Sequence, residues 1–304
     1  MSIQLITKGK NIRIINSNFK SSVTGKNYVG GVVGSLDGET LIESVTVIST
    51  VNGSTITGGF AGYAEAAVTW KNIRVNSKVG GLTRLGGLSG SLYNSESYIA
   101  ENIIVDAEVN VKDGGSQIGG VFAATRGIKM SNIDATVNII GGNATLVGGI
   151  VGALSWEANK DKLSDVIVRG TISTSVDPKD AAKRISGIAS TATSAEVTKA
   201  VDMTTIAYTN GTTTTNHVSP LTATDLSKYL NSGNVFYGLP AGATFITAAN
   251  PEFVAALTAT TAAEQKTFLA GKGFDFTNTW TIKKINGVDS IGIKEDSIPQ
   301  FPKW

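Results

Sequence analysis

The chain has 304 residues, with 35 glycines, no cysteine, 16% charged residues and a formal net charge of +2. The absence of cysteine excludes disulfides, thiolate metal sites and a cysteine nucleophile. The nearly neutral charge provides no field that favours nucleic acid or an anionic membrane surface, so we expect neither as a partner.

The first ten residues, Met1 to Lys10, contain no basic region, no sustained apolar run and no cleavage site. We therefore expect neither a signal peptide nor a membrane span, and we interpret the sequence as a fragment of a longer protein or a mature form. Little sequence precedes the first strand. We expect the strand edge near Ile12 to Phe19 to be covered by an upstream segment or by self-association with another subunit.

A Gly-Gly-x-x-Gly pattern, or a close variant, recurs at intervals of 28 to 38 residues up to a worn copy at Ser186. A period of this length indicates a repeat architecture. Because glycine permits φ > 0 and close approach of backbones, we expect these glycines to form the corners of stacked coils. The structural glycines are Gly30, Gly31, Gly34, Gly58, Gly59, Gly62, Gly86, Gly87, Gly90, Gly119, Gly120, Gly148, Gly149 and Gly152.

A short apolar alternation, usually after Asn, Ser or Asp, precedes each glycine pattern. Its period of two and its β-branched residues predict a strand with one buried face. We expect the recurring Asn to satisfy backbone groups at a corner and to stack on the Asn one coil away. The first apolar residues should form one buried stack, namely Ile12, Val45, Ile73, Ile103, Ile133 and Val166.

Together the two elements predict an all-β protein, a right-handed parallel β-solenoid (β-helix) of six to seven coils over residues 1–210. The sixth coil carries a charged insertion at 177–184, and a partial seventh follows at 197–203. Residues 211–304 predict a small α+β region that caps the end. Its elements are helices at 224–233 and 250–257, a helix opened by a capping box at Thr261 and Glu264, and a hairpin around Asn286-Gly287.

The glycine pattern, followed by a strand after Asn, resembles the GLUG-motif repeats of bacterial surface proteins. The ending is also similar to the way many such repeat regions close, with Gly273 to Trp280 and a terminal Lys303-Trp304. The resemblance covers roughly residues 10–200 and the last thirty, and residues 210–272 match no pattern. It implies a scaffold, export, an extracellular or cell-surface location, and an adhesin-like or protease-associated context.

An enzyme on this fold would need carboxylates on adjacent coils of one face. Outward positions in the predicted register concentrate no acid, and we expect Asp134 and Asp106 to form solvated ion pairs with Arg74 or Arg169. His217, the single histidine, lies in a Thr-rich linker without a matched Ser or Asp. We therefore expect no catalytic residue, no metal and no cofactor. The alternative is a polysaccharide-degrading β-helix enzyme, a lyase or glycoside hydrolase of the phage-tail type among others.

Six aromatic residues follow or flank the glycine patterns, where loops leave the body. They are Tyr28, Tyr63, Trp70, Tyr93, Tyr98 and Trp156. Exposed aromatic rings are common platforms for sugars and partner proteins, so these residues are candidates for binding an unknown glycan or protein at a cell surface. The competing interpretation is that they cover the ends of the hydrophobic core. The favoured function is an extracellular structural or adhesive module, either a binding unit or a stalk.

Overall fold

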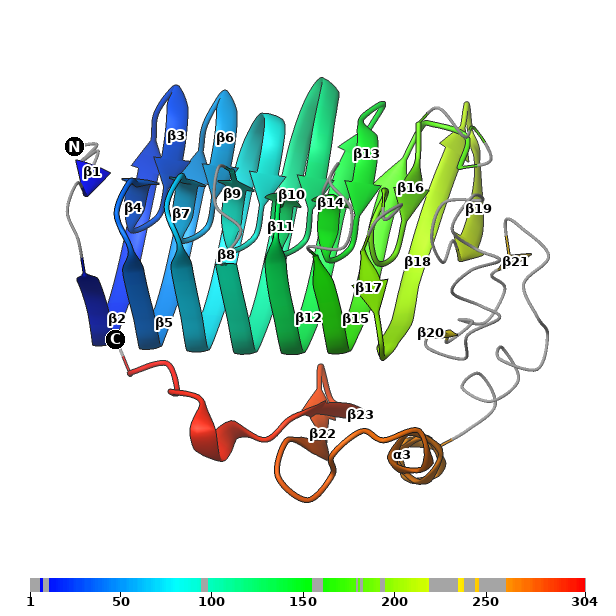
Figure 1. The fold of residues 1–304 in the computed structure, drawn as a ribbon. Coiled ribbons are helices and arrows are strands. Elements are labelled where there is room, and N and C mark those ends of the chain that lie inside the picture. Colours follow the sequence, from blue (N-terminus) through cyan, green and yellow to red (C-terminus); the bar gives the residue numbers. More distant parts are fainter. Residues whose placement is uncertain are drawn as a thin grey trace.

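The computed structural model describes residues 6–7, 11–93, 98–154, 161–178, 180, 183–191, 195–218, 235–237, 244–245 and 261–303. In these residues, parallel strands stack coil upon coil into a β-solenoid of about six turns, elongated along the stacking axis (Figure 1). The predicted fold class is therefore confirmed.

The longest strand of each coil belongs to one continuous parallel ladder, which forms the broadest wall of the solenoid. Each of the first six long strands contains a residue with φ > 0, where the strand turns. The ladder consists of β2 (Ile12–Thr24), β5 (Thr40–Asn52), β8 (Val68–Gly86), β10 (Tyr98–Gly119), β12 (Ile128–Gly142), β15 (Lys162–Thr174) and β18 (Ala200–Asn210).

Two further parallel ladders of short strands complete the coils. The first contains β3 (Asn27–Gly30), β6 (Thr55–Gly58), the ends of β8 and β10, β13 (Thr145–Gly148) and β16 (Ile185–Ser186). The second contains β1 (Ile6–Thr7), β4 (Val33–Leu36), β7 (Ala61–Ala64), β9 (Ser89–Leu92), β11 (Phe122–Ala124) and β14 (Val151–Ala153). β17 (Glu196–Val197) pairs with the start of β15.

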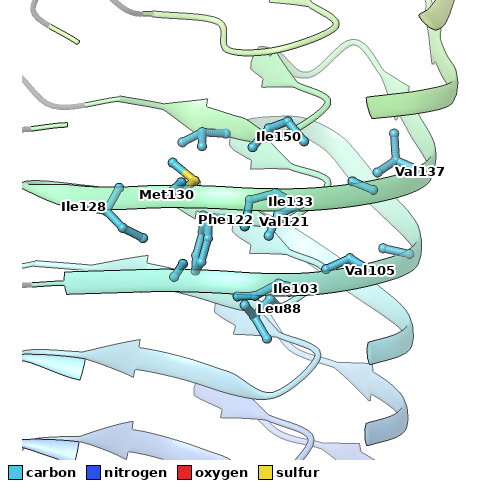
Figure 2. Packing of buried hydrophobic residues seen from close by; sticks show 14 of the residues in the cluster. Leu88, Ile103, Val105, Val121, Phe122, Ile128, Met130, Ile133, Val137 and Ile150 are labelled. Carbon is cyan, nitrogen blue, oxygen red and sulfur yellow. The ribbon is translucent and has the colours of Figure 1, made fainter. Parts of the chain in front are cut away.

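The predicted buried stack exists, with one error. Val45, Ile73, Ile103, Ile133 and Val166 are in register and fully buried, and Figure 2 shows Ile103 and Ile133 on adjacent coils. Ile12 is not part of the stack, because it pairs with Thr40 and the residue opposite Val45 is Ser17. The first coil has two candidate Asn residues, Asn11 and Asn16, both with φ > 0, and only the second aligns with the later coils.

The predicted Asn column is confirmed as a corner of the solenoid. Asn72, Asn102 and Asn132 have φ values of 56°, 55° and 55°. The Nδ2 group of Asn102 donates to Oδ1 of Asn72 at 3.1 Å, and Nδ2 of Asn132 donates to Oδ1 of Asn102 at 2.9 Å. Asn tolerates the left-handed region better than most residues, so the column combines a turn with a side-chain ladder.

The repeated glycines have one of the two predicted roles. None of the glycines in the Gly-Gly-x-x-Gly patterns adopts φ > 0 in the described chain, so the expectation of left-handed glycine corners is wrong. Their role is close approach. A Cβ on Gly59 would overlap the carbonyl oxygen of Gly87 and lie 2.6 Å from Cβ of Ser77. The Ser77 hydroxyl donates to that same carbonyl at 2.8 Å, which fills the narrow space left by the missing side chains.

The chain continues beyond the last long strand with β19 (Thr213–Val218), which returns antiparallel to β18. β20 (Val235–Tyr237) and β21 (Thr244–Phe245) add to β18 and β19, respectively. The predicted helices at 224–233 and 250–257 lie outside the described residues. Nowhere in the described chain does a helix combine the length and the hydrophobicity needed to cross a bilayer.

Residues 261–303 form a separate unit, which we call the C-terminal strap. It contains α3 (Ala262–Gly271), the hairpin of β22 (Trp280–Ile285) and β23 (Val288–Ile293), and a 3₁₀ turn η1 (Glu295–Ser297). The predicted capping box and hairpin are both confirmed, the latter with φ of 50° at Asn286 and 81° at Gly287.

The strap lies along the flank of the solenoid rather than over its end, which corrects the expectation that this part of the chain is an end cap (Figure 1). Lys199 Nζ donates to the Gly273 carbonyl at 2.8 Å, and Arg74, four coils back, donates to the Pro299 carbonyl at 3.1 Å. Apolar residues of the strap pack against outward-facing apolar residues on several coils. Together they form a second hydrophobic cluster of Ile167, Val201, Phe236, Leu269, Phe274, Trp280, Ile291, Ile293 and Ile298.

Candidate ligand-binding face

The structure divides the six candidate aromatic residues into two groups. Trp70 and Tyr98 are fully buried in the core, so the interpretation of these two as surface platforms is wrong. Trp70 stands in register with Ile42 and Ala100 on the inward side of the long ladder, and its ring packs edge-on against Phe122 at 5.7 Å. Trp156 lies outside the described residues.

The Tyr98 hydroxyl lies 3.0 Å from the Ala64 carbonyl and 2.7 Å from the Tyr93 carbonyl. It therefore satisfies backbone at the end of the core. This matches the competing interpretation of the aromatic residues, in which they close the ends of the hydrophobic interior.

The other three tyrosines lie on the outside. Tyr28 is 41% exposed, and its ring centroid lies 5.0 Å from that of Tyr63. The half-buried Tyr93 has two guanidinium groups beside its ring, those of Arg84 and Arg126, each 5.7 Å from the centroid. We call these five residues, Tyr28, Tyr63, Arg84, Tyr93 and Arg126, the Tyr/Arg band.

A recurring backbone corner positions two members of the band. Tyr28 and Arg84 occupy equivalent positions two coils apart, and both have φ of 51°. The next residues, Val29 and Leu85, are buried in the core. The same left-handed conformation recurs at the equivalent residue of the neighbouring coils, as at Gln117 with φ of 59°, so it belongs to the coil and is not a local strain at one site. The fold therefore directs these side chains outward at a fixed repeat.

A groove of about 370 Å³ runs beside the band across three coils. Thr55, Thr83 and Ser116 lie in register along it and form a hydroxyl ladder. Arg84 and Gln117 occupy the adjacent column, and Arg84 Nε donates to Gln117 Oε1 at 2.8 Å. The full lining is Thr55, Ile56, Thr83, Arg84, Ser116 and Gln117.

The groove was missed from the sequence, although a signal was present. In the first five copies, the residue three positions before the glycine pattern is Asn27, Thr55, Thr83, Ser116 or Thr145, so each of these copies carries a hydroxyl or an amide. A pattern at this position is visible only when the glycine pairs are used to align the coils, rather than the Asn-led strands.

The electrostatics of the face are uneven. In the part of the chain that the structure describes, Arg84 has no carboxylate within ion-pair distance, and its neighbours are Gln117 and the Tyr93 ring. At the other end of the band, burial raises the pKa of Tyr63, and Glu65 raises that pKa further, whereas Arg84 lowers it. Asp37 also raises the Tyr63 pKa. Tyr63 is thus influenced by carboxylates and by the Arg84 guanidinium, in opposite directions.

The charged residues considered for catalysis lie elsewhere. Asp134 is 2% exposed beneath the strap, where it pairs with Arg169 and, at 3.0 Å, with Lys283 Nζ. The expectation of a solvated ion pair is therefore wrong for Asp134 and Arg169. Asp106 is exposed and has no ion pair among the described residues, and Arg74 pairs with Glu295 of the strap at 3.3 Å.

His217 lies on β19, with its ring centroid 6.4 Å from that of Tyr208. It belongs to a strand that returns along β18, and not to the linker that we expected. No group of three metal-ligating side chains gathers within the described ranges.

Comparisons of the chain with protein-family models, with curated proteins and with solved structures find no match. The arguments about function below therefore depend on the residues and the geometry of this chain.

Proposed function

We propose that this chain is a structural and adhesive β-solenoid module that binds an extended glycan along the groove and the Tyr/Arg band. The observation that carries the proposal is the registered hydroxyl ladder of Thr55, Thr83 and Ser116 beside stacked tyrosine rings. A polymer of repeated polar units is the natural ligand for a surface that repeats its own polar groups.

The geometry supports this assignment in two ways. Successive coils of a parallel ladder are about 4.8 Å apart, so the hydroxyls form a regular row on a rigid wall. Tyrosine rings such as Tyr28 and Tyr63 offer a flat apolar surface with a polar rim, which suits the apolar face and the hydroxyls of a sugar ring. Neither feature requires a conformational change before binding.

We further propose that the module works outside the cell or at a bacterial cell surface, on the basis of the resemblance to GLUG-motif repeats. The proposal is for a role without catalysis. The described lining of the groove consists of hydroxyls, an amide, a guanidinium and one aliphatic side chain, whereas glycan hydrolysis uses a pair of carboxylates across the bond.

Binding to a panel of insoluble and immobilised polysaccharides tests the proposal. We expect retention on at least one polymer without release of reducing ends or unsaturated products. The double variant Tyr28→Ala with Tyr63→Ala should weaken binding by about tenfold, as expected for the loss of aromatic contacts.

The matched control is Tyr208→Ala, a half-buried tyrosine on β18, at the opposite end of the solenoid. This variant should bind as well as the parent. An equal loss in the control, or no retention on any polymer, would reject the proposal. Release of cleaved products would favour the polysaccharide-degrading alternative instead.

A further inference from the structure

The groove has a charge at one place, and this charge is not neutralised by the fold. Arg84 is half-buried in the lining, it forms no ion pair within the described chain, and only its Nε group has a hydrogen-bond acceptor, Oε1 of Gln117. The bond to Gln117 fixes the plane of the guanidinium. In the described chain the two Nη groups have neither a hydrogen-bond acceptor nor a carboxylate partner.

A fixed guanidinium of this kind matches a specific ligand chemistry. The planar fork of arginine binds a carboxylate through two parallel hydrogen bonds, and a guanidinium that is already oriented loses less conformational entropy on binding. Arg126 lies beside the same Tyr93 ring as Arg84, so the ring has a guanidinium group on each of two neighbours.

The tyrosine pair of the band has carboxylates within electrostatic reach. Glu65 and Asp37 both raise the pKa of Tyr63, whereas Arg84 lowers it. A ligand that spans the band would place an uncharged sugar ring over Tyr28 and Tyr63 and an acidic group at Arg84.

Resting on the glycan-binding function proposed above, we infer that the ligand is an acidic glycan whose sugar carboxylate binds the Arg84 and Gln117 end of the groove. Arg84 is the residue that determines specificity. The hydroxyl ladder and the tyrosines hold the neutral part of the chain. Removal of the positive charge should therefore abolish the preference for the acidic form, while the hydroxyl ladder and the tyrosines still bind the neutral polymer.

The test compares each acidic polymer with its own uncharged form. Polygalacturonate, alginate and hyaluronan are each measured beside the carboxyl-reduced polymer with the same backbone, by calorimetry or by biosensor binding at low salt. We expect the parent protein to bind at least one acidic form about tenfold or more tightly than its reduced counterpart. This preference should decrease as salt is added, because a half-exposed pair is screened.

Three variants resolve the role of Arg84. Arg84→Gln should reduce the preference to within twofold, because it weakens the binding of the acidic form far more than that of the reduced polymer. Arg84→Lys keeps the charge but loses the fork, and should retain only part of the preference. The control Arg13→Gln removes an identical charge at an exposed position outside this groove, and it should have no effect. Thermal midpoints equal to that of the parent show that the variants are folded.

The outcomes separate the two proposals. Equal binding of the acidic and reduced forms by the parent overturns the inference about the carboxylate and leaves the glycan-binding function intact. Absence of binding to every polymer rejects both. An equal loss in Arg84→Gln and Arg13→Gln, or equally strong binding of dextran sulfate that is insensitive to Arg84, indicates general ion exchange and also overturns the inference.

Discussion

An aspartate in the interior of the solenoid and an aspartate beneath the strap are both buried, and the pKa values of the two carboxyl groups shift in opposite directions. Asp202 lies in the interior, and burial raises its pKa from 3.8 to about 7, partly opposed by hydrogen bonds from Thr204. Asp134 lies under the strap. Burial by itself would raise its pKa, but Arg169 and Lys283 outweigh this effect and lower the pKa below its usual value.

The two environments differ in the hydrogen-bond and ion-pair partners that they provide for a buried carboxyl group. Asp202 occupies the register position of Val168, in a column that is otherwise apolar. One of its oxygens accepts hydrogen bonds from Thr204, at 2.8 Å from the amide and 2.7 Å from the hydroxyl, and the other has no partner in the described structure. Apart from Thr204 on its own strand, Asp202 faces Val168 of the preceding coil and the backbone of Gly187, neither of which can carry a compensating charge.

The flank receives a second chain segment, and this segment brings the missing partners. Lys283 lies 3.0 Å from Asp134, and the amide of Ile293 donates to the same carboxylate at 3.1 Å. Arg169, on the adjacent coil, also donates to the Ile291 carbonyl at 2.6 Å. The ion pair thus joins two coils to the strap. A buried charge is tolerated where a distant part of the sequence can compensate for it.

The largest expected effect lies in the interior and is steric. Gly59→Val should lower the free energy of unfolding by more than about 5 kcal/mol or prevent folding, because its side chain meets the Gly87 carbonyl and Ser77 in the next coil. Denaturant unfolding followed by circular dichroism measures this loss. The control is Gly271→Val at the end of α3, where an added Cβ meets nothing within 4 Å. Similar midpoints for the two variants would contradict the role of close coil contact.

The second prediction concerns the buried ion pairs of Asp134 beneath the strap. Asp134→Ala leaves Arg169 and Lys283 beneath the strap without their carboxylate, and should lower stability by about 3–5 kcal/mol. We expect the strap to become sensitive to limited proteolysis within residues 261–303, while the β signal of the solenoid persists. Glu101→Ala removes an exposed pair with Lys71 and should change stability by less than about 1 kcal/mol. If the strap resists proteolysis equally in both variants, the Asp134 ion pairs do not hold it on the solenoid.

The third prediction concerns pH. The folded protein retains the Asp202 proton up to about pH 7, whereas the unfolded chain releases it near 3.8, so the unfolded state binds fewer protons between these values. The contribution of protonated Asp202 to the free energy of unfolding is therefore fully present below about pH 4, and it is lost progressively as the pH rises to about 7. The shift corresponds to roughly 4 kcal/mol at the usual free energy of one pKa unit.

Asp202→Asn keeps the side-chain oxygen that faces Thr204 and removes the titration. Between about pH 4 and 7, the free energy of unfolding of this variant should change less with pH than that of the parent. Near neutral pH the variant should be the more stable of the two. Parallel denaturation curves over this range measure the difference. If the parent and the variant show the same slope, Asp202 does not titrate as its burial indicates.

The repeat and the register of the coils could be predicted from the sequence alone. The spacing of the glycine patterns, the period-two strands and the Asn column are local and repeated, and each copy reinforces the register of the others, so Val45 to Val166 could be aligned without a structure. The capping box at Thr261 and the Asn286-Gly287 hairpin were equally predictable, because a few adjacent residues decide them.

The buried position of some aromatic residues and the place of the strap depend on tertiary contacts that the repeat does not reveal. A shift of one residue in a strand moves a side chain from one face to the other, so Trp70 and Tyr98 could be placed in the core only through their pairing partners. The groove depends on columns that join residues some thirty positions apart. The strap meets Asp134 across 159 residues, a contact that arises from packing of apolar surface and from charge pairing, and that no local pattern encodes.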